Sequence, residues 1–105
     1  MAGFNRNESG PSHKLMIPRG DEVVGVVVKA QGASKFLVMC ADKKERDCSI
    51  PGRLRRSFWV KERDMVLVKP WPYKNAQGHD AGDIVWRYSL MDKDLLKARG
   101  VAIPK

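Results

Sequence analysis

Short apolar runs, each closed by polar or turn-forming residues, dominate the chain from residue 22 to residue 88. Runs of this length that are rich in Val, Ile and aromatic residues are typical of β-strands. The pattern predicts five strands, at Glu22–Ala30, Lys35–Ala41, Asp47–Ile50, Asp64–Pro70 and Asp83–Tyr88. Gly25 is expected to mark a bend or bulge in the first strand, because glycine inside a strand usually does so.

The period of the pattern changes after residue 88. Ser89-x-x-Asp92 resembles a helix-capping box with Asp in place of Glu, and Gly100 is a natural stop for a helix. Three apolar residues are spaced to face inward from this helix, namely Leu95, Leu96 and Ala98. Five strands and one helix predict a mainly β protein, a small barrel with a short C-terminal α-helix.

The second and third strands, joined by a short polar segment, are expected to form a hairpin. A hairpin centred near Lys44 places Cys40 opposite Cys48. Because side chains alternate along a strand, one face then becomes apolar. That face carries Phe36, Val38, Cys40, Cys48 and Ile50. The other face carries Leu37, Met39, Asp47 and Ser49, whose two apolar members are expected to pack under the tail or to line a binding surface.

The fifth strand shows a similar alternation. Ile84, Trp86 and Tyr88 are predicted to share a buried face, opposite a mixed face with Val85 and Arg87. A sheet that buries one face and offers a mixed, basic face to a partner is typical of nucleic-acid-binding barrels.

The chain of 105 residues has room for one domain with a modest core. Residues 1–20 are rich in Gly, Ser, Asn and Pro and are expected to form a flexible N-terminal tail. We expect the barrel to span residues 21–89, and the C-terminal helix with a short tail to span residues 90–105. The N-terminus lacks the apolar stretch of a secretory signal, and two cysteines do not make a disulfide scaffold, so a cytoplasmic location is expected.

Positive charge is concentrated in one segment. Twenty Lys and Arg against twelve Asp and Glu give a net charge of +8, which favours a polyanionic partner through counterion release. Residues 1–22 carry no net charge, whereas residues 53–63 hold five cations and one carboxylate. Three arginines crowd into this segment beside Phe58 and Trp59, and Arg suits phosphate because its planar group donates two parallel hydrogen bonds. A solvated charge run beside core aromatics is the alternative, but interleaved Arg and aromatic residues favour RNA contact.

Other candidate sites are weaker. Trp71 and Tyr73 stand in a Pro/Gly-rich loop, where Trp71 is expected to close the end of the barrel rather than to stack on a base. His79 is expected to be a solvated loop residue. The two cysteines are expected to be reduced core thiols, although the register leaves a cross-strand disulfide open. No motif of catalysis or of metal binding is present, so we expect no enzyme activity, no cofactor and no metal.

Three blocks of sequence resemble a known family, in the same order and at the same distances. IPGRLRRSFWV, DMVLVKPW and DIVWRY are similar to the barrel of translation initiation factor 1A, and most similar to its archaeal form. The resemblance covers roughly residues 16–100 and implies a five-stranded oligonucleotide-binding (OB) barrel. It implies a factor that binds small-subunit rRNA at the decoding A site and supports initiator tRNA placement and start-codon selection.

The resemblance also assigns site residues. Arg53, Arg55, Arg56 and Trp59 fall in the family's RNA-contacting turn. Charge and expected exposure add Lys35, Lys61, Arg63, Lys69 and Arg87 as RNA contacts. The expected partner is the small ribosomal subunit, with other initiation factors including factor 5B, no membrane, and a monomeric chain.

Two other functions and one departure from the family stay open. A generic single-stranded RNA chaperone would carry several aromatic residues on the second and third strands. A protein–protein adaptor would use the apolar patch around Leu37 and Met39. The family's Asp-Gly-Lys turn reads Asp42-Lys43-Lys44 here, and without Gly a tight type I′ turn is disfavoured, so a wider loop is expected.

Overall fold

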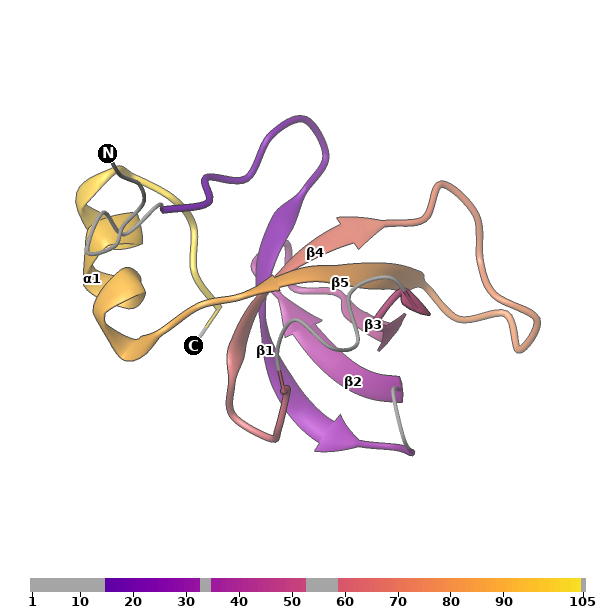
Figure 1. The fold of residues 1–105 in the computed structure, drawn as a ribbon. Coiled ribbons are helices and arrows are strands. Elements are labelled where there is room, and N and C mark those ends of the chain that lie inside the picture. The colour runs from indigo at the N-terminus through magenta and orange to yellow at the C-terminus, as the bar shows by residue number, and fades with distance from the viewer. Residues whose placement is uncertain (1–14, 33–34, 53–58, 105) are drawn as a thin grey trace, which may run out of the picture.

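The computed structural model describes residues 15–32, 35–52 and 59–104. In these residues five strands form a closed barrel in the order β1-β2-β3-β5-β4, and one helix lies beside it (Figure 1). The elements are β1 Val23–Ala30, β2 Lys35–Cys40, β3 Glu45–Ser49, β4 Met65–Pro70, β5 Ala81–Arg87 and α1 Leu90–Ala98. All neighbouring strands are antiparallel except β3 and β5, which run parallel and close the barrel. The predicted OB-type barrel with a C-terminal helix is therefore confirmed.

The inside of the barrel is filled by apolar side chains from all five strands. The buried residues of this inner cluster are Val27, Phe36, Val38, Cys40, Cys48, Ile50, Val66, Val68 and Ile84. The predicted apolar face of the β2–β3 hairpin is thus confirmed as the inward one. Gly25 lies where β1 pairs with both β2 and β4, and a Cβ there would stand 2.4 Å from Val38 Cγ1. Gly25 therefore allows close approach of strands, and the irregularity of β1 lies instead between Val27 and Lys29.

The register predicted for the hairpin is wrong, although its faces are right. Cys48 lies opposite Phe36 instead of Cys40, and Val38 lies opposite Arg46. The Cys40 N–H donates to the Lys44 carbonyl at 2.9 Å, and Lys43 has a φ of 70°, which makes a three-residue loop with a left-handed residue near its end. The loop is wider than a type I′ turn, as the missing Gly predicts. The hairpin is centred near Asp42, however, two residues before the predicted centre at Lys44.

Arg46 is a charged residue that this register turns toward the inner face. Its side chain is 8% exposed, and its two terminal nitrogens donate to Asp42 Oδ1 and Oδ2 at 3.0 and 2.8 Å. A buried guanidinium needs such a bidentate partner because desolvation otherwise penalises its charge. Hydrogen bonding from Arg46 holds the pKa of the Asp42 carboxyl below its ordinary value.

A second cluster lies outside the barrel, on the side covered by α1. Its buried members are Val24, Leu67, Tyr88 and Leu96. The predicted common face of Ile84, Trp86 and Tyr88 is wrong, because the β4–β5 register shifts between Leu67 and Val68. Ile84 points into the barrel, whereas Trp86 and Tyr88 belong to this outer cluster.

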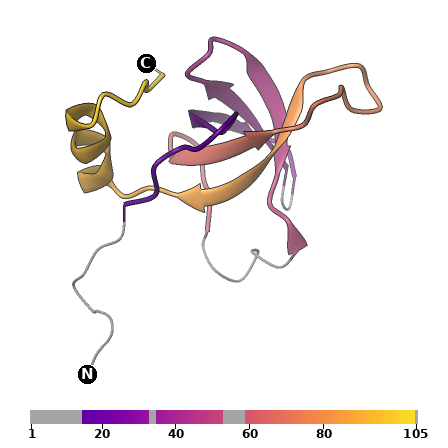
Figure 2. The same cartoon turned by 90° about the horizontal axis from the view of Figure 1, so that it is seen from above.

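Segments from both ends of the described chain complete the outer cluster. Residues 15–17, Val101 and Ile103 pack against it, and the Tyr88 hydroxyl donates to the Met16 carbonyl. Figure 2 shows α1 and the C-terminal segment together on one side of the barrel, away from the β4–β5 loop. Residues 15–17, which were assigned to the N-terminal tail from composition, thus contact the folded part of the chain. The predicted boundary between tail and barrel at residue 21 stays a prediction.

Helix α1 is capped as the sequence predicts but buries less than expected. The Asp92 carboxylate accepts the Ser89 N–H at 2.8 Å, and Gly100 has a φ of 77° just beyond the helix. Leu96 is buried against the barrel, whereas Leu95 and Ala98 are exposed, so the prediction that these two face inward is wrong. The other buried residue of α1 is Asp92, which is 1% exposed.

Replacement of Gly25 by Ala tests the close approach of strands in the barrel. The added Cβ would collide with Val38 Cγ1, and overpacking of this kind lowers the free energy of unfolding by about 1–3 kcal/mol. Urea unfolding measures the loss. Gly52→Ala is the matched control, because the Cβ that this substitution adds has no atom within 4 Å, and its change should stay within about 0.5 kcal/mol. Equal stability of the two variants would contradict this account of Gly25.

Candidate nucleic-acid interface

The segment that enters β4 presents an aromatic side chain and two cations to solvent. Trp59 is 90% exposed, and Lys61 and Arg63 are exposed as well. The Asp64 carboxylate accepts the Lys61 N–H at 2.9 Å, which closes a tight turn. The Arg63 N–H donates to the Val27 carbonyl at 2.8 Å and so ties the turn to β1. Two of the predicted cations are therefore held on a well-anchored turn close to Trp59 in the chain.

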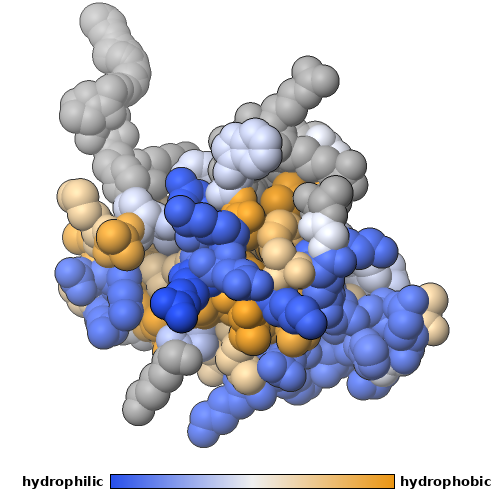
Figure 3. All heavy atoms as spheres, turned by 90° about the horizontal axis from the view of Figure 1, so that it is seen from below, coloured by the Kyte–Doolittle hydropathy of each residue, from blue (hydrophilic) through white to orange (hydrophobic). Residues whose placement is uncertain are grey.

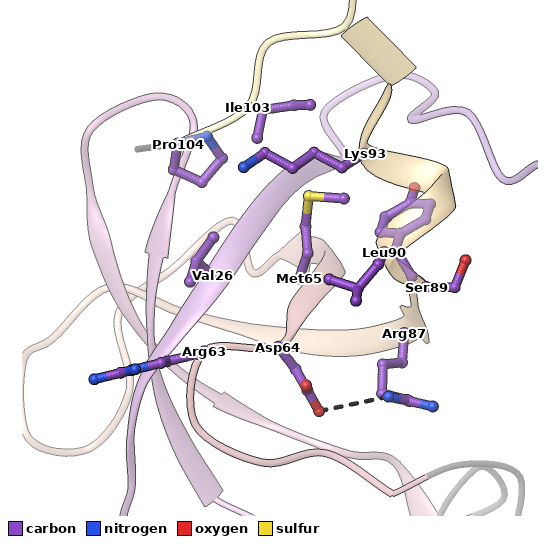
Figure 4. Close-up of a pocket in the computed structure, with 11 residues that line it drawn as sticks. Val26, Arg63, Asp64, Met65, Arg87, Ser89, Leu90, Lys93, Ile103 and Pro104 are labelled. Atoms are coloured by element: carbon purple, nitrogen blue, oxygen red, sulfur yellow. Dashed lines mark ion pairs between the residues drawn. The ribbon is translucent and has the colours of Figure 1, made fainter. Parts of the chain in front are cut away.

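Arg87 lies at the end of β5 and faces an acidic neighbour. Its guanidinium is 3.7 Å from Asp64 Oδ2, the carboxylate that also closes the turn before β4. Arg63 and Arg87 line the same cleft beside α1, together with Asp64 (Figure 4). The structure thus brings these two predicted RNA contacts together, with the charge of Arg87 partly compensated.

The other predicted cations lie elsewhere on the barrel. Lys35 begins β2 and lines a second cleft, of about 560 Å³, with Trp71 and Asn75. Lys69 is exposed on β4, in register with Asp83 of β5. The six predicted RNA contacts that lie in the described residues therefore do not form one patch. Arg53, Arg55 and Arg56 lie outside the described residues, as does Phe58, and their assignment stays a prediction.

The β4–β5 loop is tied to β3 through one carboxylate oxygen. Asp47 Oδ2 accepts a hydrogen bond from Asn75 Nδ2 at 3.0 Å and lies 2.8 Å from His79 Nδ1. Within the loop, Asn75 Oδ1 accepts the backbone N–H groups of Gln77 and His79, both at 3.0 Å. The loop is therefore an ordered hydrogen-bonded unit, and His79 has a partner that no local pattern predicts, since Asp47 is 32 residues away.

Trp71 and Tyr73 contact each other on this loop. Their ring centroids are 5.7 Å apart, and Trp71 is half-buried on the cleft that it shares with Lys35, while Tyr73 is 67% exposed. Trp71 thus lines a surface cleft, whereas the sequence predicted that it closes the end of the barrel.

The two cysteines are part of the barrel core. Cys40 and Cys48 are free and buried, and burial raises the pKa of both thiols. They are therefore protonated core residues, and the structure contains no disulfide between them.

Within residues 15–32, 35–52 and 59–104 no cluster of His, Cys, Asp and Glu is suited to a metal ion. In the same residues, no helix combines the length and the apolar character that crossing a membrane requires.

The closed barrel and the basic, aromatic surface of its turns define the class of the protein. A five-stranded barrel of this order with one terminal helix is an OB fold, a class that binds oligonucleotides or oligosaccharides. Residues 12–105 match the sequence profile of the family described as translation initiation factor 1A / IF-1. The chain belongs to the translation initiation factor 1A family.

Individual relatives agree with this assignment. Translation initiation factor 1A 1 of Haloquadratum walsbyi is 42% identical over 94 residues, which cover 90% of this chain and 94% of that protein. Translation initiation factor 1A of Pyrococcus abyssi is 42% identical over 87 residues, which cover 83% of this chain and 74% of that protein. The resemblance to the archaeal form is thus confirmed, and the chain is an RNA-binding factor of translation initiation from a non-enzymatic family.

Acidification tests the attachment of the β4–β5 loop. Hydrogen bonding from His79, then from Asn75, lowers the pKa of Asp47 below its ordinary value, so its contribution to stability is present above about pH 3.9. That contribution is lost as the pH falls through the lowered pKa of the folded state. We expect the amide signals of Gln77 and His79 in ¹H–¹⁵N spectra to shift below about pH 4.

The Asp47→Asn variant should show no such transition in the loop, because Asn does not titrate. Asp94→Asn removes an exposed carboxylate of α1 and serves as the control, in which the transition should persist. A transition in the loop that survives Asp47→Asn would show that another group controls it.

Proposed function

We propose that the chain binds small-subunit rRNA at the decoding A site and supports initiator tRNA placement and start-codon selection. Membership of the translation initiation factor 1A family supports a partner on the ribosome. The observation that carries the proposal is Trp59, which is 90% exposed at the end of the arginine-rich segment. A Trp is rarely exposed to this extent without a partner, and an exposed indole next to cations suits an unpaired base beside its phosphates.

The chemistry assigned to each group follows from its charge and shape. Arg53, Arg55 and Arg56 bind backbone phosphates through their planar guanidinium groups, and Trp59 stacks on a base. Lys61 and Arg63 extend the same basic strip along the chain. Arg87 lines the same cleft as Arg63 but has Asp64 as a partner, and Lys35 and Lys69 lie elsewhere on the barrel, so these three contribute through long-range attraction.

The two alternative functions find less support in the described surface. A cold-shock-type chaperone needs aromatic rings on β2 and β3, where the outward residues are Lys35, Leu37, Met39, Glu45, Asp47 and Ser49. An adaptor needs a free apolar patch, yet Leu37 and Met39 are both half-buried, and Met39 lines a cavity with Ile103 and Pro104 of the C-terminal segment.

Partners and setting follow from the same proposal. The chain acts as a cytoplasmic monomer without cofactor, on the small subunit and beside other initiation factors, including factor 5B.

Footprinting of small-subunit rRNA with and without the protein tests the proposed binding at the decoding A site. Protection confined to the decoding region is the expected result, and protection elsewhere would refute it.

Replacement of Arg55 and Arg56 by Ala tests the phosphate contacts. We expect weaker binding to the small subunit, and a slope of log affinity against log salt that is smaller by about 0.7–0.9 for each phosphate that is no longer neutralised. Filter binding at several salt concentrations measures both. The double variant Lys97→Ala with Arg99→Ala removes the same charge from the exposed end of α1 and should bind nearly as well as the parent chain. Equal weakening in the two double variants would point to net charge instead of a site.

Replacement of Trp59 by Ala tests base stacking. Because its side chain is 90% exposed, the variant should keep its free energy of unfolding within about 0.5 kcal/mol. Loss of one stacked base weakens RNA binding by about 1–3 kcal/mol, and Trp59→Phe, which keeps an aromatic face, should recover part of it. Affinity for the small subunit, measured beside thermal unfolding, separates the two effects. Unchanged affinity of Trp59→Ala would exclude the indole from the interface.

A further inference from the structure

A cleft of about 320 Å³ lies between the barrel and the first turn of helix α1. Its lower wall comes from the turn before β4 and the end of β5, and its upper wall comes from α1 and the C-terminal segment (Figure 4). Five of the eleven lining residues have aliphatic or thioether side chains, namely Val26, Met65, Leu90, Ile103 and Pro104. Met65, Tyr88 and Ile103 of the outer cluster form part of this lining, so the cleft lies where that cluster reaches the surface.

Positive charge surrounds the apolar lining. Lys93 reaches from α1 across the cleft toward Pro104, and Arg63 extends on the side of Val26 (Figure 4). Neither cation has an ion pair among the described residues, whereas Arg87 shares Asp64 at the lower edge. The lining thus holds three cations and one carboxylate, which leaves an excess of positive charge beside an apolar floor.

Exposed apolar side chains continue from this cleft over α1. Leu90 is 92% exposed and Met91 is 74% exposed, although each has an apolar side chain larger than Val. Figure 3 shows apolar residues at the α1 end of the face seen from below, beside hydrophilic ones. Large apolar side chains that gather beside cations at a cleft are typical of binding surfaces, because water-exposed apolar area is unfavourable.

We propose that this cleft binds a short acidic segment of a protein partner. One bulky aliphatic side chain of that segment inserts over Met65 and Leu90, and flanking carboxylates lie against Lys93 and Arg63. Charge complementarity selects an acidic partner, and the aliphatic lining selects an apolar side chain between the acidic ones. This site does not include Arg55, Arg56 or Trp59, but it shares Arg63 and Arg87 with the predicted RNA contacts.

An acidic peptide fits the cleft better than single-stranded RNA does. Proteins that bind unpaired bases stack them on exposed aromatic side chains. The aromatic residue of this lining is Tyr88, which is 3% exposed and donates its hydroxyl hydrogen bond to the Met16 carbonyl. The other apolar groups are aliphatic or thioether groups, which suit a Leu or Ile side chain.

Titration of the full chain with an acetylated, amidated peptide of sequence Glu-Asp-Leu-Asp-Glu tests the proposal. We expect ¹H–¹⁵N shifts at the amides of Met65, Leu90, Lys93 and Ile103. A control peptide with Ser in place of Leu should bind about tenfold more weakly, since it loses the burial of one aliphatic side chain. Shifts that are absent, or equal for the two peptides, would overturn the proposal.

Two variants and one control locate the peptide on the protein. Leu90→Ser and Lys93→Gln should each weaken peptide binding several-fold, and their exposed positions keep the fold intact. Lys97→Gln removes the same charge as Lys93→Gln from the same helix, outside the cleft lining, and should leave peptide affinity unchanged. Equal weakening by Lys93→Gln and Lys97→Gln would overturn the proposed site.

Hexauridine provides the remaining arm of the experiment. Stronger shifts of the same amides by hexauridine than by the peptide would make the cleft an RNA surface and overturn the proposal. None of these readouts uses Arg55, Arg56 or Trp59, so they succeed or fail independently of the ribosomal contact proposed above.

Discussion

The absence of a side chain at two glycines is the constraint on which the barrel depends. A Cβ at Gly25 would stand 2.4 Å from Val38 Cγ1, and one at Gly82 would stand 2.8 Å from Val68 Cγ1. Gly25 joins β1 to both β2 and β4, and Gly82 joins β5 to both β3 and β4. Because both glycines sit where one strand has two partners, they let a small sheet curve until its edges meet. The turns that carry the basic residues take their positions from this closure.

The sequence pattern predicted the elements well and the pairings poorly, for physical reasons. Alternation of apolar residues identifies strands and inward faces, because each strand shows it locally. Register depends on where a turn begins, and the left-handed Lys43 places the hairpin turn earlier in the chain than the predicted centre. The irregularity between Leu67 and Val68 moves Trp86 to the outer cluster, and no local pattern in β5 signals it. The pairing of strands in the folded barrel therefore sets the register, which the alternation of apolar residues alone does not determine.

The candidate site was predictable in composition but not in geometry. The focused charge of residues 53–63 and the exposed Trp59 follow from the sequence and from the family resemblance. The attachment of His79 to Asp47 and the pairing of Arg87 with Asp64 join residues that are far apart in the chain, so only the folded barrel reveals them. These contacts place the predicted basic residues of the described chain in separate positions: the turn before β4, the cleft that Trp71 shares with Lys35, and the cleft beside α1.

The outer cluster has a consequence for the order of events during synthesis. Leu96, Val101 and Ile103 are made after all five strands, yet they cover Val24 and Leu67 from strands made earlier. Until residues 96–103 emerge from the ribosome, the outer faces of β1 and β4 lack part of their cover in the nascent chain. The barrel can therefore close before its outer apolar cluster is covered. A chain truncated before residue 96 would expose this apolar surface, which favours aggregation.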